Sequence, residues 1–145
     1  MPEFKDRKDY DEKTRNKIFW KDECPLCDLT WTRDNILWKG KHWYIIRNIF
    51  PYSGEHQHLM AVPYRHITFS HELDQEEIAE IRTIHLFMKG FYGNRDYFSC
   101  TRETMANRSI EHLHVHFIPG KLQGKFIRKM LELQGFPIEE DLILS

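Results

Sequence analysis

The sequence lacks any long hydrophobic run and any marked excess of charge. No apolar stretch reaches the roughly 18 to 20 residues that a bilayer crossing requires, and the first residues lack the apolar segment of a secretion signal. Lys and Arg number 21 against 22 Asp and Glu, which argues against nucleic-acid binding through overall charge. We therefore expect a cytoplasmic protein that associates neither with membranes nor with nucleic acid.

Cysteine is scarce, and its number excludes a complete set of disulfides. Only three cysteines are present, and two of them, Cys24 and Cys27, form a C-x-x-C pair. In a cytoplasmic chain such a pair is more often metal-binding or redox-active, and no βαβ pattern supports a thioredoxin-like role. The pair can bind a tetrahedral zinc ion if two further ligands come from elsewhere. A reduced, metal-free pair in the core is the alternative.

The length and the hydrophobic patterning indicate a single domain. With 145 residues, the chain can bury roughly two thirds of the surface that its unfolded form exposes. Residues 1–20 carry many charges of both signs and are expected to form a charged N-terminal extension, whereas residues 21–145 form the domain and its C-terminal helix. Apolar, β-favouring runs predict strands at residues 36–38, 43–46, 58–62 and 97–101, with a hairpin turn at 39–41.

Two amphipathic helices are predicted as well. The first follows Asp74, which suits a helix N-cap, and glycines at 90 and 93 mark its end. Its buried face is expected to carry Ile78, Ile81, Ile84 and Met88. The second follows Gly120, and its apolar face is expected to carry Leu122, Phe126, Met130 and Leu133.

Three histidines alternate with apolar residues in the segment 112–116, His-Leu-His-Val-His. Side chains at i, i+2 and i+4 of a β-strand point to one face, so the pattern predicts a strand with His112, His114 and His116 on one surface. Leu113 and Val115, with Phe117 beyond them, would face the core. Neighbouring rings would lie roughly 7 Å apart, which suits attack on a phosphorus atom by one ring while the next holds its oxygens.

Residues 109–119 resemble the signature of the histidine triad family, in which three histidines alternate with apolar residues after a serine. Residues 48–52 and 58–66 are similar to the nucleotide-binding strand and turn of that family. The resemblance spans about residues 24–120. It implies an α+β fold with a five-stranded antiparallel sheet and two main helices, a homodimer, and a small-molecule nucleotide as substrate.

The resemblance also implies the chemistry. His114 would attack the α-phosphorus of a nucleotide, and water or an acceptor would resolve the nucleotidyl-histidine. Such a ring must be neutral, so its other nitrogen should donate to a backbone carbonyl or a similar acceptor. His116 would bind a phosphate oxygen and protonate the leaving group, and Ser109 would stabilise the developing charge. We expect dinucleoside polyphosphates or nucleoside phosphoramidates as substrates.

Four further positions are expected to bind the nucleotide. The resemblance assigns a ribose contact to Asn48 and a place in the pocket to His58. Asn107 and Arg108 stand where the family commonly has Gly-Gln; Asn tolerates a positive φ, and Arg108 can bind a phosphate or face solvent. The interval from Asn48 to His58 is about two residues longer than expected.

Some histidine triad proteins, and the related galactose-1-phosphate uridylyltransferases, hold a zinc ion through a cysteine pair and two histidines. The resemblance assigns this role to Cys24, Cys27, His66 and His112, with a structural zinc that leaves the other triad histidines for chemistry. Two alternatives are a nucleotide-binding module without catalysis, and a hydrolase whose catalytic metal is bound by His58, His112 and His114.

Overall fold

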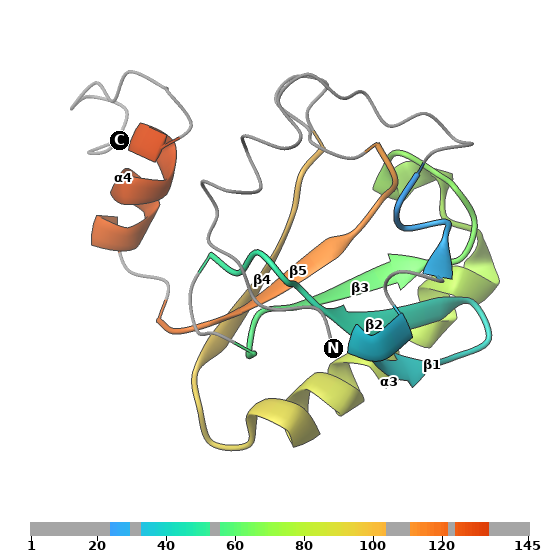
Figure 1. Cartoon of the computed structure of the whole chain (residues 1–145), viewed down its shortest axis with the longest axis horizontal. Coiled ribbons are helices and arrows are strands. Elements are labelled where there is room, and N and C mark those ends of the chain that lie inside the picture. Colours follow the sequence, from blue (N-terminus) through green and yellow to red (C-terminus); the bar gives the residue numbers. More distant parts are fainter. Residues whose placement is uncertain (1–23, 30–32, 53–55, 104–110, 122–123, 134–145) are drawn as a thin grey trace.

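The computed structural model describes residues 24–29, 33–52, 56–103, 111–121 and 124–133, which form one sheet with a long helix against it (Figure 1). The expected N-terminal extension, Ser109, Asn107 and Arg108 lie outside these residues. No helix in the described ranges combines the length and the hydropathy needed to cross a membrane.

The sheet has five strands, and all neighbouring strands are antiparallel. Its order is β1-β2-β3-β5-β4, so that β5, the last strand in the described part of the chain, inserts between β3 and β4. This confirms the α+β fold with a five-stranded antiparallel sheet. The strands are β1 (Ile36–Lys39), β2 (Trp43–Arg47), β3 (Leu59–Pro63), β4 (Tyr97–Thr101) and β5 (Val115–Pro119).

The two faces of the sheet bury different sets of side chains, as the period of two in a strand requires. Helix α3 (Gln75–Tyr92) covers one face. The core on that side contains Trp43, Ile45, Leu59, Ala61, Ile84, Met88, Tyr92, Leu113 and Phe117. On the opposite face, Cys24 and Leu26 pack on Tyr44, Ile46, Met60 and Val62. The loop of residues 24–29, called the N-terminal loop below, therefore lies on the face of the sheet that α3 does not cover.

Helix α3 begins as predicted, but its first turn buries a charged residue. Asp74 is the N-cap, and its side chain accepts a hydrogen bond from the backbone N–H of Glu77. Ile84 and Met88 are buried, whereas Ile78 is 53% exposed, so its predicted burial is wrong. Glu77, at 2% exposed, takes the inward position instead, because the guanidinium of Arg65 pairs with its carboxylate at 2.6 Å.

The histidine segment is a strand only at its end, so the prediction of a strand through residues 112–116 is wrong in its position. Strand β5 begins at Val115. Before it, the backbone N–H of Leu113 donates to the carbonyl of Ile67 at 2.7 Å instead of joining the ladder. The alternation itself is confirmed: Leu113 and Phe117 are in the core beside α3, and Val115 packs against it.

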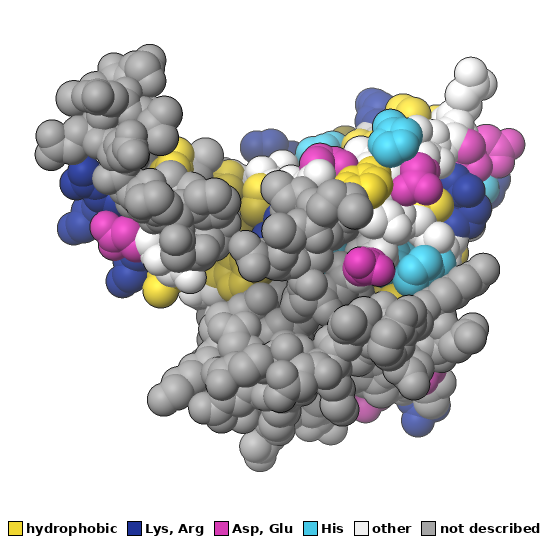
Figure 2. Space-filling view, turned by 90° about the horizontal axis from the view of Figure 1, so that it is seen from above, with side chains coloured by type: hydrophobic (Ala, Val, Ile, Leu, Met, Phe, Trp, Pro, Cys, Tyr) yellow, Lys and Arg dark blue, Asp and Glu magenta, His cyan; other side chains and the backbone are white. Residues whose placement is uncertain are grey.

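The remaining elements lie outside the sheet. Two short 3-10 helices are η2 (Arg33–Asn35) and η3 (Ser70–Glu72). The predicted C-terminal helix is α4 (Gly124–Leu133), although Leu133 is 79% exposed and is not packed as expected. Lys and Arg side chains gather at this end of the molecule (Figure 2); Lys125, Arg128 and Lys129 of α4 are exposed there.

Candidate functional site

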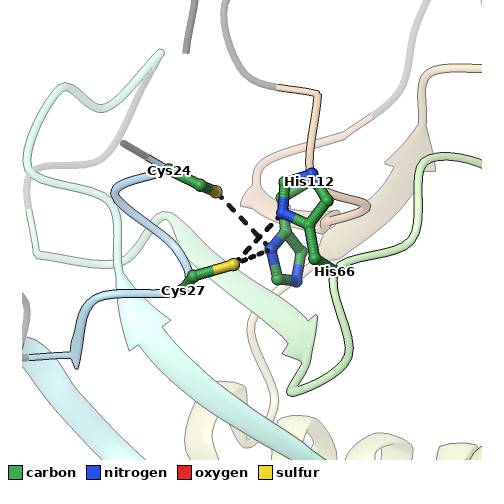
Figure 3. A group of neighbouring side chains, drawn as sticks. All are labelled: Cys24, Cys27, His66 and His112. Atoms are coloured by element: carbon green, nitrogen blue, oxygen red, sulfur yellow. Dashed lines mark hydrogen bonds between the residues drawn. The ribbon is translucent and has the colours of Figure 1, made fainter. Parts of the chain in front are cut away.

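Four side chains from three separate segments form a cluster with the donor set of a metal site. Cys24 and Cys27 come from the N-terminal loop, His66 from the turn after β3, and His112 from the segment before β5 (Figure 3). Their ligand atoms all lie within 4.8 Å of one another. The structure thus brings together the four residues that the resemblance implied.

The distances within this cluster fit a tetrahedral ion. Zinc bonds of about 2.3 Å to sulfur and 2.0–2.1 Å to nitrogen place such ligands about 3.6 Å apart. Cys24 Sγ lies 3.6 Å from His112 Nδ1, and Cys27 Sγ lies 3.3 Å from the same nitrogen and 3.1 Å from His66 Nδ1. These three distances lie within about 0.5 Å of that separation, so small side-chain adjustments around an ion would give regular coordination.

Hydrogen bonds and burial keep His112 in the form that a metal requires. Its Nε2–H donates to the carbonyl of Pro63 at 2.7 Å, so the lone pair of the neutral ring is on Nδ1, which faces the thiols. Burial lowers the pKa of His112 to about 4. Because both ring nitrogens are engaged in this way, the described structure does not join His112 to His58 and His114 in a second metal site.

Neighbouring elements hold each segment of the cluster. The Tyr44 hydroxyl of β2 donates to the carbonyl of Leu26 at 2.5 Å, which fixes the loop between the two cysteines. The turn that carries His66 is held at both ends, by His112 Nε2 on Pro63 and by Leu113 N–H on Ile67. Arg65 in the middle of this turn reaches Glu77 of α3 through two nitrogens, at 2.6 and 3.1 Å.

The backbone carbonyl of His112 fixes the tautomer of His114. His114 Nδ1 donates to the carbonyl of His112 at 2.8 Å, so in the neutral ring Nε2 carries the lone pair. This is the hydrogen bond that a nucleophilic histidine needs. The His114 and His116 rings lie 4.8 Å apart between centroids, closer than the roughly 7 Å of a regular strand, since His114 precedes the ladder.

Two successive hydrogen bonds fix His116 in the tautomer opposite to that of His114, with its proton on Nε2. The backbone N–H of Tyr52 donates to His58 Nδ1 at 3.1 Å, so the proton of His58 is on Nε2. That Nε2–H donates to His116 Nδ1 at 2.8 Å, and the proton of His116 is therefore on its Nε2. Both rings are buried. The site thus presents a lone pair on His114 beside an N–H donor on His116.

Tyr52 and Arg102 also lie around His116, and the sequence had predicted no role for either of them in the site. The ring of Tyr52 lies 4.7 Å from His58 and 5.2 Å from His116, between centroids. Arg102, just after β4, donates from Nη2 to the Tyr52 hydroxyl at 3.3 Å. The sequence alone gave no signal for Arg102, because its place depends on the pairing of Cys100, two residues earlier, with His116 across the sheet.

Asn48, for which a ribose contact is expected, has a structural role in the described residues. It is buried, and its Oδ1 accepts a hydrogen bond from the N–H of Phe50 at 2.8 Å. Its own N–H donates to the carbonyl of His58 at 2.8 Å. Asn48 therefore shapes the turn that presents the Tyr52 amide to His58.

Comparison with known proteins gives one family and a common fold. The family described as scavenger mRNA decapping enzyme C-term binding matches residues 23–131. No curated protein matches the sequence. A hypothetical protein from Leishmania major is similar in structure, with a TM-score of 0.60, 16% identity, and coverage of 80% of this chain and 96% of the other.

Two further solved structures share the fold at low sequence identity. A diadenosine triphosphate hydrolase from Plasmodium falciparum gives a TM-score of 0.52 and 22% identity over 61% of this chain and 63% of that one. A HIT family hydrolase from Legionella pneumophila gives a TM-score of 0.52 and 17% identity, over 68% of this chain and 93% of that one. At these identities the likeness establishes the fold, and the chemistry has to be argued from the site.

Proposed function

The chain belongs to the family described as scavenger mRNA decapping enzyme C-term binding, and from this membership and the site geometry we propose that it is a histidine triad enzyme that acts on nucleotides. It hydrolyses or transfers a nucleotidyl group at the α-phosphate through a covalent bond to His114. The observation that carries this proposal is the pair of fixed, opposite hydrogen-bond states on His114 and His116.

In the first step, the lone pair of His114 Nε2 attacks the α-phosphorus. The N–P bond forms, the bond from phosphorus to the leaving oxygen breaks, and its electron pair stays on that oxygen. The positive charge that develops on the His114 ring is stabilised because Nδ1–H donates to the His112 carbonyl, 2.8 Å away. His116 Nε2–H is directed to donate a hydrogen bond to the leaving oxygen.

In the second step, water or an acceptor hydroxyl attacks the same phosphorus. The N–P bond breaks, the lone pair returns to His114 Nε2, and the proton of the attacking group passes to solvent. Roles in binding the phosphate oxygens and the nucleotide remain predictions for Ser109, Asn107 and Arg108, as does a ribose contact for Asn48. For His58, buried and bonded to His116, we propose a positioning role.

We propose that Cys24, Cys27, His66 and His112 bind a structural zinc ion. The donor types and distances support this assignment. The ion, when bound, supplies a cross-link between three segments and no reacting group. His112 connects this cluster to the reaction, since its side chain belongs to the ligand set and its carbonyl holds His114.

The test of the proposed function is a trapping experiment. The full-length protein is mixed with nucleotides labelled at the α-phosphate, quenched with base, and examined for label on the chain. Wild type should retain label, and His114→Ala should retain none and lose turnover about a thousandfold or more. His85→Ala, an exposed position on α3, should keep activity within about twofold. Full turnover in His114→Ala would remove the mechanism, and tight binding without turnover by wild type would favour a non-catalytic module.

A further inference from the structure

Helix α4 and the residues just before it carry a concentration of positive charge. Residues 112–131 contain four cations and no acidic residue, although the net charge of the whole chain is −1. The cations are Lys121, Lys125, Arg128 and Lys129, and all of them are exposed. Figure 2 shows Lys and Arg side chains gathered at this end of the molecule. The near-neutral overall charge therefore conceals a local basic patch, called the α4 patch below.

The helix exposes aliphatic side chains as well as cations. Arg128 and Lys129 follow Lys125 by three and four residues, so the three lie within about one third of the helix circumference. At about 100° per residue, Ile127 lies nearly opposite to them, and Leu133 lies at the border between the two sides. Ile127 is 44% exposed and Leu133 is 79% exposed. Neither belongs to the two core clusters of the described residues.

The α4 patch is attached to the sheet at the end away from the histidine site. Strand β5 begins beside His114 and ends at Pro119, and α4 follows beyond that end (Figure 1). Gly120 turns the chain with a φ of 118°, a conformation that favours glycine. Its N–H donates to the carbonyl of Asp96 at 2.9 Å. A surface that binds α4 therefore does not need to cover the histidines.

We propose that the α4 patch docks the protein on an anionic lipid surface. An amphipathic helix that lies in the plane of a membrane surface places its cations at the headgroups and its aliphatic side chains among the upper parts of the acyl chains. Clusters of about four or more Lys and Arg are attracted to negatively charged headgroups. Peripheral binding of this kind needs no membrane-spanning segment, so the lack of a long hydrophobic run does not oppose it.

Two other occupants would use less of what α4 exposes. A nucleic-acid backbone would pair with the cations, but it would leave Ile127 and Leu133 in water. A second copy of the chain, packed on the same patch about a two-fold axis, would bring like charges together. A lipid surface matches both the charge and the exposed aliphatic side chains of the helix, and it is therefore the occupant that these residues favour.

Sedimentation of the full-length protein with lipid vesicles tests the proposal. The vesicles are pure phosphatidylcholine, or phosphatidylcholine with roughly one third phosphatidylserine. Wild type should sediment only with the anionic vesicles, and about 0.5 M salt should release most of it by screening. The double variant Lys125→Gln, Arg128→Gln should bind roughly 25-fold more weakly, about fivefold for each charge. Ile127→Ser should bind at least about fivefold more weakly.

A matched control removes the same charge elsewhere. The double variant Lys39→Gln, Arg82→Gln changes exposed residues of β1 and α3 and should bind like wild type. Thermal unfolding checks that each variant is folded. All variants should retain the label trapped on His114 in solution, and because the docking surface does not depend on the proposed function, failure of that trapping would leave this inference standing.

Four outcomes would overturn the lipid assignment. Equal binding of wild type to both kinds of vesicle would exclude recognition of charge, and equal losses in the α4 variant and its control would exclude this helix. Tighter binding of a single-stranded oligonucleotide than of anionic vesicles would assign the patch to nucleic acid. Dimers that Ile127→Ser abolishes, without any binding to vesicles, would assign it to a second copy of the chain.

Discussion

Hydrogen bonds between single residues determine which nitrogen of each histidine carries the proton. His112, His114 and His116 have the same side chain and alternate along the chain, yet they receive three different partners: the carbonyl of Pro63, the carbonyl of His112 and the ring of His58. In the proposed function, His112 is a metal ligand, His114 is the nucleophile and His116 is a hydrogen-bond donor. The chemical role follows from the partner, because a neutral imidazole has one donor and one acceptor nitrogen.

A pair of substitutions at His58 tests the chain of donors to His116. Gln carries an amide nitrogen near the position of His Nε2 and can donate to His116 Nδ1, whereas Leu cannot. We expect His58→Leu to lower kcat/KM by roughly tenfold, the effect of one hydrogen bond of about 1 to 1.5 kcal/mol, and His58→Gln to keep most of the activity. Equal losses in the two variants would show that His58 acts through packing alone.

At the scale of elements, α3 fixes the β1–β2 turn through one carboxylate. Glu80 accepts hydrogen bonds from the backbone N–H groups of Lys41, His42 and Trp43, at 2.9 to 3.0 Å. Gly40 permits this approach, because a Cβ there would lie 2.4 Å from Glu80 Oε1. The hairpin and the helix are thereby joined, and β2 is positioned for the strands that carry the site.

Replacement of Glu80 by Ala should leave these three N–H groups without their shared acceptor. We expect the free energy of unfolding to fall by about 1 to 3 kcal/mol, measured by urea denaturation. Glu76→Gln is the matched control on the same helix, since Glu76 is exposed and only faces His42 at 3.4 Å; its effect should stay within about 0.5 kcal/mol. A loss in Glu80→Ala no greater than in this control would contradict the tethering role.

At the scale of the whole molecule, the metal-type cluster joins segments that are far apart in the chain. Cys24 and Cys27 are 88 and 85 residues from His112, and Cys27 is 39 residues from His66. A cross-link over such separations restricts the unfolded chain strongly. A bound ion should therefore stabilise the face of the sheet that carries the histidines. The homodimer and the cytoplasmic location remain predictions at this scale.

Metal analysis of the purified protein should find one zinc per chain. Cys27→Ser should lose the metal and lower Tm by about 5 to 10 °C, since 1 kcal/mol corresponds to roughly 3 to 6 °C at this size. Cys100→Ser is the control, because Cys100 lies in β4 outside the cluster, and it should retain the full zinc content. Full metal content in Cys27→Ser would exclude this ligand set.

Local patterns were sufficient to predict most of the strands and the start of α3, and to indicate the types of residue in the candidate site. The β-favouring runs predicted β2 and β4, and the cap at Asp74 predicted the start of α3. The C-x-x-C pair indicated a metal site. These features depend on neighbours within a few residues, so the local sequence is enough to predict the secondary structure that these residues prefer.

The sequence by itself determined that Leu113, Val115 and Phe117 face the core beside α3, because alternation in an extended segment is a local property. Only the tertiary structure decided that Ile78 is exposed while Glu77 is buried, that β5 begins at Val115, and that Arg102 lies near His116. Each of these depends on a partner distant in the chain. A hydrogen bond or ion pair across the fold outweighs a local preference of less than about 1 kcal/mol per residue.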